Sequence, residues 1–196
     1  MDLFPAFIKL AGRRVVVIGG GPVAASKLLA LLNSGADITV VAPEIVPEIR
    51  NFSVTVLERG FQLSDLDGAW LVIAAATPDV NRTVAQAAET RHIFVNAVDD
   101  PPNATMYLGG VVRRAGVTFA ISTDGRAPAL AGLLREALDS MLPTRDLEQW
   151  MAEAAQLRQH WQKDAVPMQN RRPELLESLI RLYKTPENKA VTNELS

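Results

Sequence analysis

In about the first hundred residues, short apolar runs alternate with turn residues and with segments of mixed polarity. Unbroken apolar runs of this length are typical of strands buried on both faces of a parallel sheet. We therefore predict an α/β fold in which strands and helices alternate to form a doubly wound parallel sheet. The predicted strands are Val15–Ile18, Asp37–Val41, Val54–Leu57, Trp70–Ala76 and Ile93–Val98, and the predicted helices begin at Pro22 and span Pro78–Thr90.

The pattern changes after Asp99, where the turn-rich segment DDPPNAT leads into two apolar runs. Met106–Val112 and Val117–Thr123 flank Arg113-Arg114-Ala115-Gly116 and predict a β-hairpin. Apolar residues at helical spacing predict helices over Pro128–Leu142, Leu147–Gln162 and Glu174–Tyr183, and the polar end Thr185–Ser196 predicts a frayed tail. We expect a sheet domain at 1–104, a hairpin and helix domain at 105–145, a helical domain at 146–184 and a tail at 185–196.

Three consecutive glycines separate the first predicted strand from the first predicted helix in VVVIGGGPVAASK. Gly19, Gly21 and Ala24 fit the G-x-G-x-x-G/A spacing, in which the residues allow a tight turn, close approach of a pyrophosphate and close helix packing, respectively. Pro22 suits the first turn of a helix, whose free amides can hold phosphates. The alternative is a glycine-rich turn without a ligand. The strand before it and the helix after it favour a Rossmann-type dinucleotide site.

One part of this fingerprint is missing. An acidic residue that holds a ribose hydroxyl usually follows about 20 residues later, but here the second predicted strand runs into Ala42 and Pro43. Glu44 lies slightly late for that role and is alternatively a solvated loop charge. Because no Arg is present there either, we expect NAD as the cofactor rather than NADP. The predicted cofactor-binding residues are Gly19, Gly20, Gly21, Pro22, Val23, Ala24, Ala42, Pro43, Glu44, Ala75, Thr77 and Asn96.

Composition narrows the candidate functions. The chain has 196 residues, 48% of them hydrophobic, which is enough to bury a core. Its net charge of −2 provides no overall basic field for nucleic acid or an anionic membrane. The absence of cysteine excludes disulfides, thiolate catalysis and cysteine-based zinc sites, and two histidines leave little for a metal. Because we find neither a signal peptide nor an apolar run long enough for a membrane span, we expect a cytoplasmic protein.

The carboxyl end of the fifth predicted strand carries Asn96 and Asp99. Ligands of open α/β sheets bind at this edge, where the Asp99 carboxylate could take a proton beside a nicotinamide. The alternative role of Asp99 is to cap the DDPP turn, and that of Asn96 is to cap the strand end.

Two further segments carry candidate anion-binding groups. Ser122, Thr123, Gly125 and Arg126 lie just before a predicted helix, where hydroxyls, free amides and a guanidinium form a sensible receptor for a carboxylate. Ordinary helix capping would use the same groups. The Arg113-Arg114 pair is in the simplest interpretation a solvated hairpin tip, and only a polyanionic ligand would give it a role.

The order of GGGPVAASK, WLVIAAA, NAVDDP and FAISTDGRAPALAGLLREALDSMLP resembles the dehydrogenase module of the siroheme synthases. The resemblance covers roughly residues 1–180 and identifies the chain as a member of the precorrin-2 dehydrogenase family. It implies NAD-dependent oxidation of precorrin-2 to sirohydrochlorin, and in bifunctional members also insertion of ferrous iron to give siroheme. Both reactions would use one cleft of a homodimer.

The resemblance also implies roles for individual residues. Asp99 matches the family's essential aspartate, which removes protons from the tetrapyrrole. Because precorrin-2 is a polycarboxylate, Arg113, Arg114 and Arg126 gain a purpose in substrate binding, together with Ser122, Thr123 and Gly125. Thr123 matches a position that is a regulatory phosphorylated Ser in some members.

The sequence departs from the family pattern at two places. Ala127 replaces the Ser of ISTxGxSP, and Met106-Tyr107-Leu108-Gly109 replaces the Phe-x-x-Pro that usually follows NxVDxP. These changes bear on chelation more than on dehydrogenation. A different class of function, a dinucleotide-sensing regulatory module without chemistry, stays open as the alternative, although NAVDDP and ISTDGRAP are not needed by a sensor.

The segment after the predicted hairpin is too thin to bury its own apolar face. Leu130, Leu133, Leu134 and Met141 share one side of the predicted helix Pro128–Leu142. We therefore expect the chain to form a homodimer through this region.

Overall fold

The computed structural model describes residues 3–184, so the predicted tail at 185–196 lies outside the described residues. The chain divides into two compact units. The first comprises Met1–Leu108 together with Ser122–Ala127, and the second comprises Gly109–Ile121 together with Pro128–Ser196. The domain boundaries at residues 104 and 145 stay predictions.

The first unit is built on a five-stranded parallel sheet with the order β3-β2-β1-β4-β5. The predicted doubly wound α/β fold is therefore confirmed. The strands are β1 (Arg14–Ile18), β2 (Asp37–Ala42), β3 (Thr55–Glu58), β4 (Leu71–Ala74) and β5 (Phe94–Ala97). The helices are α1 (Pro22–Leu31), α2 (Pro47–Arg50) and α3 (Pro78–Glu89), with 3-10 turns at Leu32–Ser34, Leu63–Leu66 and Pro101–Asn103.

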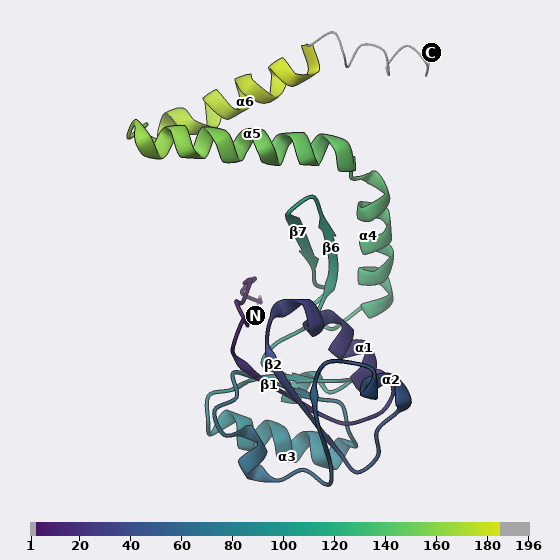
Figure 1. Cartoon of the computed structure of the whole chain (residues 1–196). Coiled ribbons are helices and arrows are strands. Elements are labelled where there is room, and N and C mark those ends of the chain that lie inside the picture. Colours follow the sequence, from purple (N-terminus) through teal and green to yellow (C-terminus); the bar gives the residue numbers. More distant parts are fainter. Residues whose placement is uncertain (1–2, 185–196) are drawn as a thin grey trace. The chain divides into compact units, whose positions relative to one another are not determined.

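Strand β1 is apolar at consecutive positions because both of its faces are covered. Val15 and Val17 pack with residues of α1, whereas Val16 and Ile18 pack with residues of α3. All four side chains are almost completely buried. Figure 1 shows α1 and α3 on opposite faces of the sheet. The run that predicted a buried strand thus forms the central layer of the unit.

The direction of chain progression reverses between β1 and β4. From β1 the chain proceeds to β2 and β3 on one side, then returns to β4 and β5 on the other. In open α/β sheets, such a switch point leaves a crevice at the carboxyl ends of the strands, where ligands bind. The topology therefore fixes where a site can form.

The second unit begins with an antiparallel hairpin of β6 (Gly110–Arg114) and β7 (Val117–Ile121). The interpretation of Arg113 and Arg114 as turn residues is wrong, because they pair with Thr118 and Val117 in the ladder. Only Ala115 and Gly116 form the turn, with φ of 49° and 79°. A positive φ at both central residues is typical of a two-residue hairpin turn, and Ala is an unusual residue there. The sequence RRAG therefore did not reveal how short the loop is.

Within residues 128–184 the hairpin is followed by the helices α4 (Pro128–Met141), α5 (Thr144–Lys163) and α6 (Met168–Lys184). Helix α6 begins before the predicted start at Glu174 and includes Pro173. The α5–α6 pair is held by polar contacts: the Trp161 indole donates to Glu174 over 2.7 Å, and the Ser178 hydroxyl donates to Glu153. In the described part of the chain, none of the helices is long and apolar enough to cross a membrane.

Asp65 anchors the 3-10 turn Leu63–Leu66 in the first unit. Its buried carboxylate accepts two hydrogen bonds from Arg59, at 2.6 and 2.8 Å, and one from the Gln62 backbone N–H at 2.8 Å. The Arg59 guanidinium lowers the pKa of the Asp65 carboxyl, and this effect outweighs the opposing effect of burial. The ionised form is therefore favoured by folding.

We expect Asp65→Asn to reduce the free energy of unfolding at pH 7 by about 1–3 kcal/mol, because three charge-assisted hydrogen bonds are weakened. A carboxyl group with a lowered folded-state pKa stabilises the protein above its unfolded pKa of about 4 and loses this contribution as pH falls further. The difference between wild type and variant should therefore shrink below about pH 4. Urea denaturation at several pH values measures it.

The matched control is Glu58→Gln, which removes the exposed ion pair with Arg50. It should change stability much less, because water already solvates both partners. An Asp65→Asn effect that does not depend on pH would contradict the assigned role of the charge.

Candidate functional site

The first two glycines of the turn after β1 are required by close backbone contacts. A Cβ on Gly19, whose φ is 129°, would lie 2.3 Å from the carbonyl oxygen of Ala75. A Cβ on Gly20 would lie 2.0 Å from the carbonyl oxygen of Glu44. The Val46 N–H also donates to the Gly20 carbonyl over 2.8 Å. The segments that follow β2 and β4 are thus packed directly against the glycine turn.

Gly21 is different, because a Cβ built on it meets no described atom within 4 Å. It is the N-cap of α1, and no side chain caps this helix end. Pro22 follows as the first helical residue, so the amides of Val23 and Ala24 begin the helix without intrahelical acceptors. The pyrophosphate of a dinucleotide fits this position, because the space is open and both the free amides and the positive end of the helix dipole attract an anion.

The predicted contacts after β2 lie where the sequence placed them, at the carboxyl end of the strand. Ala42 is the last residue of β2 and is buried, whereas Pro43 and Glu44 are exposed. The Glu44 backbone packs on Gly20, so the residue has a structural role whether or not its carboxylate contacts a ribose. The contact between the Glu44 carboxylate and a ribose stays a prediction.

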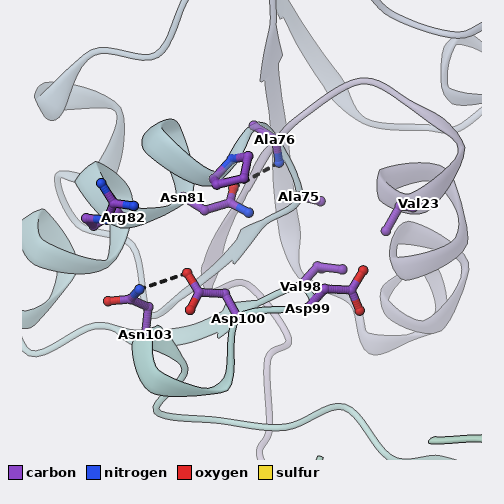
Figure 2. Close-up of a pocket in the computed structure, with 10 residues that line it drawn as sticks. Val23, Ala75, Ala76, Asn81, Arg82, Val98, Asp99, Asp100 and Asn103 are labelled. Carbon is purple, nitrogen blue, oxygen red and sulfur yellow. Dashed lines mark hydrogen bonds between the residues drawn. The ribbon is translucent and has the colours of Figure 1, made fainter.

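A pocket of about 450 Å³ lies at the carboxyl ends of β4 and β5 and beside the start of α1 (Figure 2). It brings together three of the predicted site residues, Val23, Ala75 and Asp99. Among the described residues, no three Asp, Glu or His side chains lie close enough together to hold a metal ion. The remaining lining residues are Ala76, Pro78, Asn81, Arg82, Val98, Asp100 and Asn103.

Asp99 lies in this pocket with an exposed side chain and a φ of 55°. A positive φ is uncommon for a residue with a side chain and is concentrated at functional sites. The turn is held by its neighbour: the Asp100 carboxylate accepts from the Asn103 side-chain amide over 2.7 Å, and the Asp100 carbonyl accepts from the Asn103 backbone N–H. In the described part of the chain the Asp99 carboxylate makes no hydrogen bond. It is therefore available for a ligand.

Of the twelve predicted cofactor residues, Val23 and Ala75 line the pocket and the other ten do not. Two of these ten, Asn96 and Thr77, have clear local roles. Asn96 is buried in β5, where its amide nitrogen donates to the Met106 carbonyl over 3.0 Å and so ties the strand to the segment that follows. Thr77 is the N-cap residue of α3, and its carbonyl accepts from the Asn81 N–H. The contact with the Met106 carbonyl gives Asn96 a structural role in the sheet, and its contact with a cofactor stays a prediction.

The Ser122–Arg126 segment belongs to the first unit, although it follows the hairpin in sequence. A Cβ on Gly125 would lie 3.0 Å from the ring of Tyr107, whose hydroxyl donates to the Pro101 carbonyl. The segment thus packs beside the turn that follows Asp99. Its hydroxyls are used locally, since Ser122 accepts from the Asp124 N–H and Thr123 accepts from the Ala127 N–H.

The two hairpin arginines belong to the second unit and differ from each other. Arg113 is exposed on β6. Arg114 is ion-paired with Asp139 at 2.6 Å and donates to the Leu142 carbonyl and the Thr144 hydroxyl. Arg114 therefore joins the hairpin to the end of α4 and the start of α5, a structural role that the sequence did not reveal.

Four polar pocket residues were missed: Asn81, Arg82, Asp100 and Asn103. Asn81 and Arg82 lie near the start of α3, directly after β4. Their position after a buried strand is the signal that could have identified them, because the βα turns of a parallel sheet converge at one edge. Without the strand order, however, every polar residue that follows a strand is an equally good candidate for the site.

The comparisons with known proteins agree with this geometry. Residues 6–110 match the sequence model of a family described as "Putative NAD(P)-binding". The chain belongs to this NAD(P)-binding family. The matched region includes the glycine turn, all five strands of the parallel sheet and Asp99.

The chain is also similar to siroheme synthases, and the predicted resemblance is confirmed. It is 41% identical over 177 residues to the siroheme synthase of Citrobacter koseri and 43% identical over 148 residues to siroheme synthase 3 of Aeromonas hydrophila. These alignments cover 88% and 73% of this chain but only 38% and 32% of the relatives. The matched part of the chain thus spans only about a third of the length of these enzymes.

Among solved structures, the chain is similar to "SirC, precorrin-2 dehydrogenase", with a TM-score of 0.70 and 23% sequence identity. The match covers 96% of this chain and 92% of that one. At this identity the likeness supports the fold, with its hairpin and C-terminal helices.

The glycines give a test that separates folding from binding. We expect Gly20→Ala to lower the free energy of unfolding by about 1–3 kcal/mol or more, because its Cβ would overlap the Glu44 carbonyl. Gly21→Ala should cost less than about 1 kcal/mol, because its Cβ enters open space. It should nevertheless weaken NAD binding more than about 10-fold, because that space is where the pyrophosphate fits. Urea denaturation and titration calorimetry measure the two effects.

A Gly21→Ala variant that binds NAD as well as the wild type would show that the open space is not the pyrophosphate site. Equal destabilisation by the two substitutions would contradict the different packing of the two glycines.

Proposed function

We propose that this chain is an NAD-dependent precorrin-2 dehydrogenase of siroheme biosynthesis. The observation that carries the proposal is the unpaired Asp99 carboxylate in the pocket beside the start of α1. A base at the carboxyl edge of a dinucleotide-binding sheet is suited to an oxidation that removes a hydride and a proton. The similarity to siroheme synthases supports the proposed pathway, and the NAD(P)-binding family match supports the cofactor class.

The dehydrogenation converts precorrin-2 and NAD⁺ into sirohydrochlorin, NADH and a proton. When bound, the nicotinamide supplies the acceptor for the hydride. Asp99 accepts the proton at a carboxylate oxygen, which is free of other hydrogen bonds in the described structure. Gly21, Val23 and Ala24 hold the pyrophosphate, and Ala75 contributes the wall of the pocket on the β4 side. The turn made by Asp100 and Asn103 keeps Asp99 in its unusual backbone conformation.

We propose NAD rather than NADP as the cofactor. An additional 2′-phosphate would need a cation near the end of β2, and the residues there are Ala42, Pro43 and Glu44. A carboxylate at Glu44 repels a phosphate, and it can accept a hydrogen bond from an unmodified ribose.

The carboxylates of the macrocycle require cationic partners. We assign Arg126 and Arg113 to this role together with the amides and hydroxyls of Ser122, Thr123 and Gly125. Arg126 is 81% exposed and only weakly tied to Asp124 at 3.1 Å, so its guanidinium can be recruited at little cost. Arg114 also stays a predicted substrate contact, although its guanidinium already has three partners in the second unit.

Iron insertion is a second proposed activity, since the siroheme synthases to which this chain is similar are named for the iron-containing product. Ferrous iron is a substrate in this step. The removal of pyrrole N–H protons again needs a base, and Asp99 is the carboxylate that supplies it. Incubation with sirohydrochlorin and ferrous iron, without NAD, separates chelation from dehydrogenation by the absorbance spectrum.

We further propose that two copies of the chain associate through α4. Only Ala131 of this helix is buried, whereas Leu133 is 64% exposed and Met141 is 78% exposed. Leu130 and Leu134 extend the same apolar face. A face of this kind is stabilised by covering it with an identical face across a two-fold axis.

For the dehydrogenase, we expect NADH to appear at 340 nm when wild type is given precorrin-2 and NAD. Asp99→Asn should reduce kcat/KM by about 100-fold or more, because the variant keeps the shape of the side chain and loses the base. The Kd for NAD, measured by titration calorimetry, should change less than about 2-fold.

The matched control is Asp79→Asn, an almost fully exposed carboxylate in the first turn of α3, which should retain full activity. NAD binding without any turnover by the wild type would refute the dehydrogenase and favour the regulatory module. Full activity of Asp99→Asn would refute the assigned base.

For the dimer, we expect light scattering to give twice the mass of one chain. Leu133→Glu should weaken the association by roughly 100-fold or more, because it buries an unpaired charge in the contact. Leu29→Glu places the same charge at a similarly exposed leucine on α1 and should leave the mass unchanged. A wild type that is monomeric at all concentrations would contradict this proposal.

A further inference from the structure

Asn81 is the most deeply buried polar side chain in the wall of the pocket. It is 4% exposed and lies near the start of α3. Its carbonyl oxygen accepts from the Ala76 N–H over 2.9 Å, which holds the turn between β4 and α3. This contact uses one end of the amide.

The other end of the amide is free. The Asn81 nitrogen donates no hydrogen bond in the described part of the chain, yet it is not sealed from the pocket, which the residue lines. In Figure 2 this nitrogen points into the space between the β4–α3 turn and the two aspartates. A buried amide with one end fixed and an unused donor aimed into a cavity is suited to binding an acceptor, because burying an unpaired donor is costly.

The strand order indicates which part of a dinucleotide reaches this donor. The pyrophosphate fits at Gly21, and the adenosine ribose is recognised beyond the end of β2. Strands β2 and β4 lie on opposite sides of β1, so the remaining half of the molecule extends over β4 and β5. The Asn81 nitrogen therefore faces the nicotinamide half.

We propose that Asn81 is a cofactor-positioning residue that fixes the nicotinamide half by donating to one of its oxygen atoms, a ribose hydroxyl or the carboxamide carbonyl. This inference rests on the proposed function, because it concerns the same site. The carbonyl end of the side chain sets the shape of the turn, and the nitrogen end orients the ring toward Asp99. One side-chain amide thus connects the β4–α3 turn to the nicotinamide ring.

Two substitutions separate these two roles. Asn81→Asp keeps an oxygen to accept from the Ala76 N–H and removes the donor. Asn81→Leu has the same number and branching of side-chain heavy atoms and removes both the acceptor and the donor. Titration calorimetry with NAD and with ADP, which lacks the nicotinamide half, distinguishes loss of the donor from damage to the turn. Thr83→Ala, an exposed position on the same helix, is the matched control.

We expect Asn81→Asp to weaken NAD binding by about 10-fold or more, the effect of one lost buried donor, and to change ADP binding by less than about 2-fold. The new carboxylate would attract the cationic nicotinamide, so its charge alone would increase the affinity for NAD. A decrease in affinity is therefore attributed to the missing hydrogen-bond donor. Asn81→Leu should weaken both ligands, because the β4–α3 turn also packs on Gly19. Thr83→Ala should bind both as the wild type does.

Wild-type affinity of Asn81→Asp for NAD would overturn the inference and leave the proposed function intact. Equal losses for NAD and ADP would also overturn it, because they would show that Asn81 acts only on the turn. A wild type that binds ADP but not NAD would refute the proposed function and this inference together.

Discussion

The contact of the two loops after β2 and β4 with the glycine turn is the constraint on which the rest of this site depends. The carbonyl oxygens of Ala75 and Glu44 lie so close to Gly19 and Gly20 that no side chain fits at either position. The ends of β1, β2 and β4 are thereby locked into one edge, and α1 starts in a fixed direction from it. A cofactor that lies across this edge contacts preorganised amides rather than mobile loops.

The buried sheet makes this precision possible. Because β1 is covered on both faces, a shift of any neighbouring strand would open a cavity or force side chains to overlap, and both are costly in a close-packed core. The candidate reactive side chains lie in the loops at the carboxyl ends of the strands, where the backbone is less regular. Asp99 has a positive φ, and the Asp100 and Asn103 pair maintains it. The rigid sheet holds the loop in place, and the loop keeps Asp99 in an uncommon backbone conformation.

The two departures from the family pattern also have a physical interpretation. Met106 and Leu108 are partly buried against the core of the first unit, and Tyr107 lies against Gly125 and donates to the Pro101 carbonyl. The segment Met106–Gly109 therefore keeps an anchoring function without the usual Phe and Pro. At Ala127 the backbone N–H donates to the Thr123 hydroxyl, which does not involve the side chain. The local turn thus does not need the missing Ser.

The sequence alone determined the five strands and the two longer helices of the first unit, the glycine turn and the likeness to siroheme synthases. These features depend on local spacing and on residue types that tolerate few substitutes. It also identified Asp99 as a candidate base. Only the tertiary structure decided that Arg114 binds the end of α4, that Asn96 ties β5 to the next segment, and that Asn81 faces the pocket. The physical reason is that these roles depend on partners distant in the chain. A hydrophobic pattern records which face of an element is buried, but it does not record which polar groups meet there.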